Sequence, residues 1–320
     1  MLGATNLSDD SRAPLLIHSV ADLRRWRRNA LMAGKTVGMV PTMGALHDGH
    51  LNLVRRARTS CDLVVVCIYV NPSQFAPHED LDQYPRTLQQ DIALLGGSAK
   101  DAARQTDASA TGCLADVVFA PSNESVYPDG ITTVRKDQRG AFVEVLGLSH
   151  QMEGVTRPHF FRGVATIVTK LINLVQPDRV FFGQKDAQQC VVVRSLIRNL
   201  CLPVEMTVVE TTREQDGLAM SSRNRYLTAE ERQPAIALYK ALRRAQTAYL
   251  EGERRRSALM ELANAEISAA PNVSLEYLSL AHPRTLDELD NIGEDGAIIS
   301  GAIRMPSARL IDNLLLGCEL

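Results

Sequence analysis

The sequence predicts an α/β fold: a parallel sheet with helices on both faces, followed by a smaller α+β domain. Residues 36–40 and 62–70 are near-continuous apolar runs rich in β-branched side chains, as is typical of strands buried on both faces of a parallel sheet. Between them, Leu51, Leu53, Val54 and Ala57 recur at helical spacing. The three segments therefore predict a right-handed strand–helix–strand crossover.

A first helix is predicted before this unit, over residues 19–33. Ser19 and Asp22 match a capping pattern, and Gly34 can end the helix. After the crossover, helices and strands continue to alternate. The predicted elements are helices over 84–95, 161–175 and 187–201 and strands over 116–120, 179–182 and 204–209. Residues 96–112 are small and polar, and we interpret them as a surface insertion without a catalytic role.

The pattern changes near residue 211. Residues 211–227 are polar and lack a clear period, and a charged helical stretch follows from Thr228. Strand candidates then lie at 273–281, 297–304 and 309–311. We therefore predict an α/β domain over residues 1–211 and a smaller α+β domain over residues 212–320.

Composition excludes several classes of protein. The chain has 320 residues, a net charge of −2 and 45% hydrophobic residues, which is ordinary for a globular protein. The short basic runs at 24–28 and 254–256 are expected to be solvated helix faces, so nucleic acid is not a predicted partner. No apolar stretch approaches the roughly 20 residues that cross a bilayer, so no membrane partner is predicted either.

Cysteine spacing points to a reduced compartment. None of the six cysteines is placed in a CxxC pair or another ligand pattern, and most lie in apolar runs. We expect free thiols and a cytoplasmic protein. The six are Cys61, Cys67, Cys113, Cys190, Cys201 and Cys318.

Residues 41–51 (PTMGALHDGHL) form the turn between the first apolar strand and its helix. Asp48 is the predicted N-cap, so His50 falls in the first helical turn, where free N–H groups and the helix dipole favour a phosphate. Gly44 and Gly49 let the backbone come close to such an anion. The imidazoles of His47 and His50 could then hydrogen-bond a triphosphate.

This H-x-G-H turn resembles the signature of the nucleotidylyltransferase and class I tRNA synthetase superfamily, which has a Rossmann-like nucleotide domain. Five segments together, PTMGALHDGHLNLVRRA, VNPSQFAPHEDLDQYPRT, HFFRGVATIVTKLINLVQPD, FFGQKDAQQ and DGLAMSSRNRYL, resemble the pantoate:β-alanine ligase family. The resemblance implies ATP-dependent condensation of (R)-pantoate with β-alanine through a pantoyl adenylate, giving pantothenate, AMP and pyrophosphate. It also implies Mg²⁺, carried mainly by the ATP phosphates, and a homodimer.

The resemblance also implies a set of site residues. His47, His50, Lys185 and Arg223 would be catalytic. Gln74 and Gln189 would hold pantoate, with Gln74 also holding β-alanine and Asn71 beside them, and Asp91 is a weak candidate for Mg²⁺. The ATP site would comprise Met43, Gly44, Ala45, Leu46, His47, Asp48, Gly49, His50, Gly183, Gln184, Lys185, Asp186, Thr212, Met220, Ser221, Ser222 and Arg223. The chain departs from the family pattern at Gln184 (commonly Glu), Ala187 (commonly aromatic) and Thr212 (often Val).

The expected chemistry fits these residue types. A carboxylic acid has a pKa of about 4, so pantoate is ionised at pH 7 and can attack the α-phosphorus without a base. Cationic and N–H groups then have to stabilise the departing pyrophosphate, and one well-placed donor can contribute about 3 kcal/mol. Lys185, Arg223 and the two histidines are expected to supply positive potential. The sequence identifies no base for the β-alanine amine.

Two other functions remain open from the sequence. The H-x-G-H turn alone also fits a nucleotidylyltransferase that moves AMP onto a phosphate ester; the two glutamine segments count against it. A non-catalytic nucleotide-binding protein would explain residues 96–112 and the departures at Gln184 and Ala187. It would bind ATP without turnover.

Overall fold

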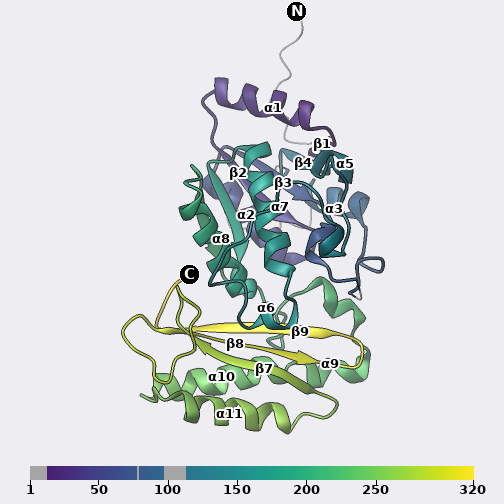
Figure 1. Cartoon of the computed structure of the whole chain (residues 1–320). Coiled ribbons are helices and arrows are strands. Elements are labelled where there is room, and N and C mark those ends of the chain that lie inside the picture. The colour runs from purple at the N-terminus through teal and green to yellow at the C-terminus, as the bar shows by residue number, and fades with distance from the viewer. Residues whose placement is uncertain (1–12, 78, 97–112) are drawn as a thin grey trace, which may run out of the picture.

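The computed structural model describes residues 13–77, 79–96 and 113–320. Its larger part, the upper half of the molecule in Figure 1, contains a six-stranded sheet. Each hydrogen-bonded pair of strands in this sheet runs parallel, in the order β1-β4-β3-β2-β5-β6. The α/β prediction is therefore confirmed. The strands are β1 (Leu15–Ile17), β2 (Val37–Thr42), β3 (Leu63–Ile68), β4 (Val117–Phe119), β5 (Arg179–Gly183) and β6 (Glu205–Val209).

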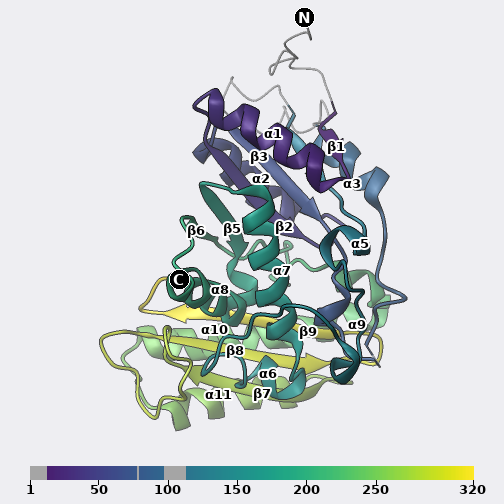
Figure 2. The same cartoon turned by 45° about the horizontal axis from the view of Figure 1, so that its top comes forward.

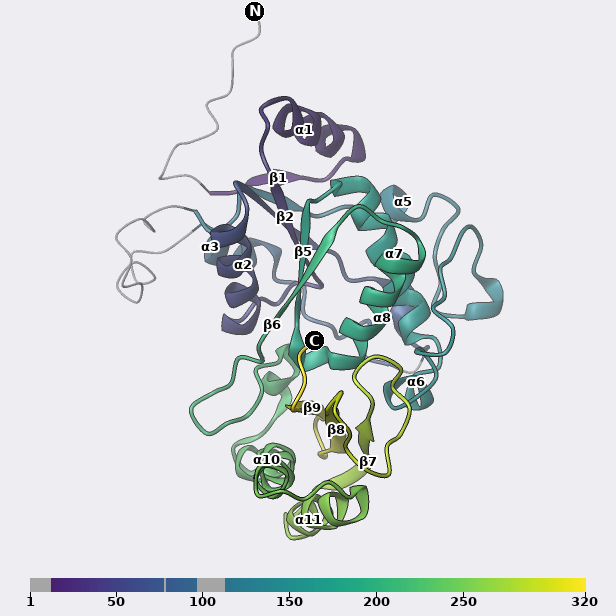
Figure 3. The ribbon, with the colours of Figure 1, turned by 90° about the vertical axis from the view of Figure 1, so that its left-hand side faces the viewer.

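Helices cover both faces of this sheet because its strands are apolar on both sides. In β2, Met39 joins the core cluster shared with α1 (Val20–Met32), α7 (Phe160–Val175) and α8 (Ala187–Asn199). Val40 next to it joins the cluster on the opposite face, with α2 (Asp48–Ser60) and α3 (Leu88–Leu95). Figure 3 shows α2 and α3 on one side of the sheet and α7 and α8 on the other.

Strand order brings three loops to one edge of the sheet. β2 pairs with both β3 and β5, and all three run in the same direction. The segments that follow their carboxyl ends are the histidine turn (residues 43–47), η1 (Pro72–Gln74) and η3 (Gln184–Asp186). Ligands bind at this edge in open α/β sheets.

A smaller domain lies below that edge (Figures 1 and 2). The antiparallel strands β7 (Ser274–Ala281), β8 (Ala297–Arg304) and β9 (Arg309–Leu316) bury one face against α10 (Ala237–Leu250) and α11 (Arg256–Ser268). On the other face, Ile298 and Leu286 pack against Ala187 and Val191 at the start of α8. The connection between the two sheets includes η4 (Ser222–Tyr226) and α9 (Ala229–Ala235), whose Thr228 and Glu231 form a capping box.

Several predicted boundaries were wrong. The helix expected from residue 84 begins only at Leu88, with Thr87 as its N-cap. Pro85 disfavours helical backbone at Tyr84, the residue before it. The N-cap of α2 is His47, and Asp48 is the first helical residue. β9 ends at Leu316, well beyond the predicted Ile311.

The sequence also missed some short elements. β1, α5 (Asn123–Val126), α6 (Glu153–Thr156) and η2 (Arg135–Asp137) have three or four residues each, too few to show a period. The expected insertion at 96–112 lies outside the described residues except for Gly96, the C-cap of α3. Among the described residues, no helix is long and apolar enough to cross a membrane.

Candidate active site

A cleft of about 720 Å³ lies between the carboxyl edge of the parallel sheet and the smaller domain. Both domains contribute residues to its walls, for example Thr42 of β2 in the larger domain and Asn313 of β9 in the smaller one. Most of the predicted site residues line it together. These are Met43, His47, Gly49, His50, Asn71, Gln74, Gly183, Lys185, Asp186, Gln189, Thr212, Met220, Ser221, Ser222 and Arg223.

The histidine turn depends on two glycines. Gly44 has φ +82°, in the left-handed region where a residue without a β-carbon is favoured. Gly49 lies against the His47 ring: a Cβ on Gly49 would stand 2.9 Å from His47 Cε1. The two imidazoles in turn lie with their ring centroids 4.1 Å apart. The backbone therefore fixes the ring pair at the N-terminus of α2.

Both histidines are neutral at pH 7 in this structure. Burial, followed by the charge of Lys185, lowers the pKa of His47 to about 4. Burial, followed by repulsion from His47 and Lys185, lowers the pKa of His50 well below its usual value. The expectation that the imidazoles supply positive charge is therefore wrong for this state. They can still donate neutral N–H hydrogen bonds to an anion.

Lys185 and Asp186 follow β5, and a side chain of the smaller domain holds their turn. Lys185 Nζ lies 3.7 Å from Asp186 Oδ1. The Asn313 amide of β9 donates to the carbonyl oxygens of Gln184 (2.8 Å) and Lys185 (2.9 Å). Asn313 is buried, and no local signal in the sequence marks it. This contact ties the Lys185 turn to the smaller sheet.

The segment that follows β3 brings Asn71 and Gln74 to the wall of the cleft. Asn71 is completely buried and accepts a hydrogen bond from the hydroxyl of Tyr127 (2.8 Å). Its amide nitrogen donates to Gln74 Oε1 (3.0 Å), and Gln74 Nε2 points at the sulfur of Met43 (3.1 Å). Arg157 donates to the Gln74 backbone carbonyl. Gln74 is thereby fixed beside the histidine turn.

Gln189 lines the same cleft from the first turn of α8. Its neighbour Gln188 also borders the cleft, but its side chain is occupied by protein: the amide donates to the carbonyls of Leu148 and Gln151, and its oxygen accepts from the Glu153 backbone. Of these two glutamines, Gln188 thus has a structural role.

The serine–arginine loop, residues 220–223, lines the same cleft. Arg223 donates to both carboxylate oxygens of Asp80 (3.1 and 3.3 Å), and the Ser222 hydroxyl lies 3.3 Å from the Tyr84 hydroxyl. Burial would lower the pKa of Arg223, but Asp80 outweighs this and raises it. The partner Asp80 was missed by sequence reasoning. In this structure the guanidinium of Arg223 is hydrogen-bonded to the Asp80 carboxylate, at the place where it would otherwise bind a phosphate.

Thr212 links this loop to α2, the helix that follows the histidine turn. Its hydroxyl accepts a hydrogen bond from the Asn52 amide of α2 (2.8 Å). Its carbonyl accepts one from the Met220 backbone N–H (2.9 Å). The loop and the histidine turn are therefore joined on the side of α2.

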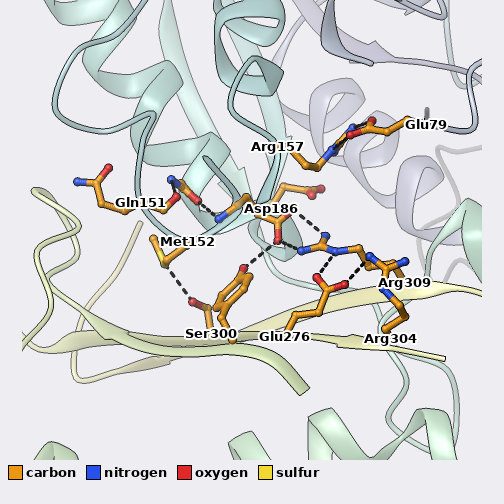
Figure 4. A network of polar contacts seen from close by, with 12 residues as sticks. Glu79, Gln151, Met152, Arg157, Asp186, Glu276, Ser300, Arg304 and Arg309 are labelled. Atoms are coloured by element: carbon orange, nitrogen blue, oxygen red, sulfur yellow. Dashed lines mark hydrogen bonds and ion pairs between the residues drawn. The ribbon is translucent and has the colours of Figure 1, made fainter. Parts of the chain in front are cut away.

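An ionic network (Figure 4) includes four residues that line the cleft, Glu153, Tyr277, Arg304 and Arg309. Arg309 of β9 donates twice to Glu153 of α6 (2.6 and 2.8 Å) and once to Glu276 of β7 (2.6 Å). The Tyr277 hydroxyl also donates to Glu153 (3.0 Å), and Arg304 pairs with Glu276. Burial, reinforced by Glu153, raises the pKa of Tyr277 well above its usual value. The network joins the smaller sheet to the larger domain.

Six predicted residues do not line this cleft. Gly44 and Ala45 are buried in the histidine turn, and Leu46 and Asp48 border a shallower hollow beside it. Gln184 packs toward Asn313. Asp91 is 1% exposed, and both of its oxygens accept backbone N–H groups. Its position does not suit a metal ligand, because those oxygens are already occupied.

The described residues hold no cluster of three or more His, Cys, Asp or Glu side chains that could bind a metal ion. Phosphate oxygens and water are the ligands that Mg²⁺ commonly keeps at nucleotide sites.

Comparison with known proteins decides the family. The family model for pantoate-beta-alanine ligase matches residues 15–315, which include every cleft residue named above. The chain belongs to the pantoate-beta-alanine ligase family. Among its relatives, the pantothenate synthetase of Chloroflexus aggregans is 48% identical over 301 residues, covering 94% of this chain and 99% of the relative. That of Pelotomaculum thermopropionicum is 42% identical over 303 residues, covering 95% and 99%.

Solved structures of the ligase family share the fold. The crystal structure of pantothenate synthetase from Thermus thermophilus superposes with a TM-score of 0.80 at 40% identity, covering 94% of this chain and 98% of that one. Pantoate-beta-alanine ligase from Francisella tularensis, complexed with beta-gamma ATP and beta-alanine, gives 0.71 at 30% identity, covering 95% and 98%.

Proposed function

We propose that this chain is an AMP-forming ligase that condenses (R)-pantoate with β-alanine to give pantothenate, through a pantoyl-adenylate intermediate. The observation that carries the proposal is the cleft itself: in a chain of this family, one cavity is lined by His47, His50, Lys185 and Arg223 together with Gln74 and Gln189. The related Francisella enzyme was crystallised in complex with beta-gamma ATP and beta-alanine, which supports ATP and β-alanine as substrates here.

In the first half-reaction, a carboxylate oxygen of pantoate attacks the α-phosphorus of ATP. The bond from that phosphorus to the bridging oxygen breaks, and pyrophosphate leaves. Lys185 and Arg223 would supply positive charge, and His47 and His50 would donate N–H hydrogen bonds to the phosphates. Gln74 and Gln189 would hold the hydroxy acid in line.

In the second half-reaction, β-alanine attacks the carbonyl carbon of the adenylate. Its ammonium group must first lose a proton, because only the free amine is a nucleophile. The carbon–oxygen bond then breaks, and AMP leaves with the oxygen that pantoate contributed. Gln74 would contact both substrates, which is consistent with its fixed position on the wall beside Met43.

Further properties belong to the same proposal. ATP would carry Mg²⁺ on its phosphates, and the ion would supply positive charge near the leaving pyrophosphate. Residues 212–320 would form a lid over the domain of residues 1–211. The enzyme would be a homodimer, checked by light scattering of the purified chain. It would act in the cytoplasm, which suits its six free cysteines.

The test is AMP formation by the purified protein with ATP, Mg²⁺, pantoate and β-alanine. We expect AMP and pantothenate in equal amounts, and loss of both when pantoate is omitted. AMP transfer to a phosphate ester without need for an amine would instead identify a nucleotidylyltransferase. ATP binding without turnover would identify a nucleotide-binding protein, and either result would reject the ligase.

A further inference from the structure

Asp91 lies directly under the histidine turn. Its Oδ2 accepts the backbone N–H of Ala45 (3.1 Å), and its Oδ1 accepts that of Leu46 (2.9 Å). The Thr87 hydroxyl lies 3.3 Å from both oxygens. The side chain also stands in the first turn of α3, where the helix dipole favours an anion. The buried carboxylate of Asp91 is therefore hydrogen-bonded by backbone and side-chain donors of this chain.

The turn above Asp91 has a backbone that needs such support. Gly44 and Ala45 both have positive φ, +82° and +51°, and a residue with a β-carbon seldom takes up this conformation. Strained backbone of this kind persists only where its surroundings hold it. A Cβ on Gly44 would also lie 3.1 Å from Asp91 Oδ2, so the turn and the carboxylate are closely packed.

The supported segment leads straight into the histidine pair. Leu46 immediately precedes His47, which is the N-cap of α2, and His50 follows in the first turn. β2 holds one end of the turn and α2 the other, and the Asp91 bonds hold its middle. Because the N–H groups of Ala45 and Leu46 are occupied by Asp91, they do not serve as phosphate donors.

We propose that Asp91 is a positioning residue for adenylate formation. It fixes the strained turn through Ala45 and Leu46 and thereby sets where His47 and His50 meet the triphosphate, without itself touching ATP or Mg²⁺. The inference rests on the proposed function, since it assumes that this cleft forms an adenylate.

The test variant is Asp91→Asn, which keeps the size of the side chain but turns one acceptor oxygen into a donor that faces an N–H group. We expect pantoate-dependent pyrophosphate release to fall about a hundredfold in kcat, the scale of a small misplacement of catalytic groups. The Mg²⁺ concentration for half-maximal rate should stay unchanged. Amide hydrogen exchange at residues 44–47 should become faster. Gln90→Ala, an exposed neighbour on α3, is the matched control and should behave as wild type.

Three results would overturn the proposal. A raised Mg²⁺ requirement, with the rate restored by excess Mg²⁺, would make Asp91 a metal ligand. Unchanged kcat in a folded Asp91→Asn protein, or unchanged exchange at residues 44–47, would remove its positioning role. If Asp91→Asn does not fold, Thr87→Val gives the milder form of the test, with a smaller fall in kcat expected and unchanged kcat counting against the proposal. An inactive wild-type protein would instead reject the ligase function itself.

Discussion

The neutral state of His47 makes the stability of this protein sensitive to acid. Burial, followed by Lys185, lowers the pKa of His47 from 6.5 to about 4. The unfolded chain therefore binds a proton at this site at pH values where the folded chain does not. This contribution to stability is fully present above about pH 6.5 and is lost as the pH falls toward 4.

The size of the effect follows from the shift. One pKa unit corresponds to about 1.4 kcal/mol, so the full shift is worth about 3 kcal/mol. Between pH 7 and pH 5, only part of this range is crossed, and the free energy of unfolding should fall by about 2 kcal/mol through His47 alone. His50 adds to the fall in the same direction, because its pKa is also lowered.

The assay is urea unfolding of wild type and His47→Gln at pH 7 and pH 5, followed by the fluorescence of Trp26, the single tryptophan, which packs against the core of the larger domain. The fall in unfolding free energy should be about 2 kcal/mol smaller in His47→Gln. His150→Gln, at an exposed position, should match wild type. Equal falls in wild type and His47→Gln would refute the reasoning.

Three further predictions concern the cleft. Glu153→Ala should lower the free energy of unfolding by about 3 kcal/mol, because Arg309 loses a buried partner. Urea unfolding checks this, with Glu294→Ala at an exposed position as the control. Similar free energies of unfolding for the two variants would contradict the prediction. Asp80→Asn should tighten binding of a non-hydrolysable ATP analogue up to about fivefold in calorimetry, because Arg223 is freed; weaker binding would count against it. Gly49→Ala should lower kcat at least about tenfold by displacing the His47 ring. Gly293→Ala, at a glycine with open space around it, is the control and should leave kcat unchanged. Equal kcat values for the two variants would reject the role of Gly49.

The sequence predicted those parts of the fold and the cleft that carry local signals. The apolar runs of β2 and β3 and the helical period between them were sufficient for the central crossover. The loops that follow β2, β3 and β5 could then be assigned to one sheet edge, because parallel strands end on the same side. His47, Gln74 and Lys185 do line one cleft.

The remaining features depend on contacts between residues far apart in the chain. Arg309 and Glu153 are separated by 156 positions, and Arg223 and Asp80 by 143. No periodicity or spacing marks such pairs before the fold is known. The neutral state of the histidines is hidden in the same way, because it results mainly from burial.

The role of Asp91 shows how far a single residue can be interpreted from the sequence alone. Its carboxylate belongs to no recognisable ligand pattern, so the sequence could offer it only as a weak metal candidate. The start of α3 at Leu88 and the strained backbone at Ala45 decide that it faces two N–H groups instead. Both are properties of tertiary structure.

The central claim is that this cleft joins pantoate to the α-phosphorus of ATP before the amine attacks. The most direct measurement uses pantoate labelled with ¹⁸O in its carboxylate and mass spectrometry of the AMP produced with β-alanine. An adenylate intermediate predicts one ¹⁸O atom in the phosphate of each AMP. Unlabelled AMP, or ¹⁸O released in inorganic phosphate or pyrophosphate, would contradict the claim.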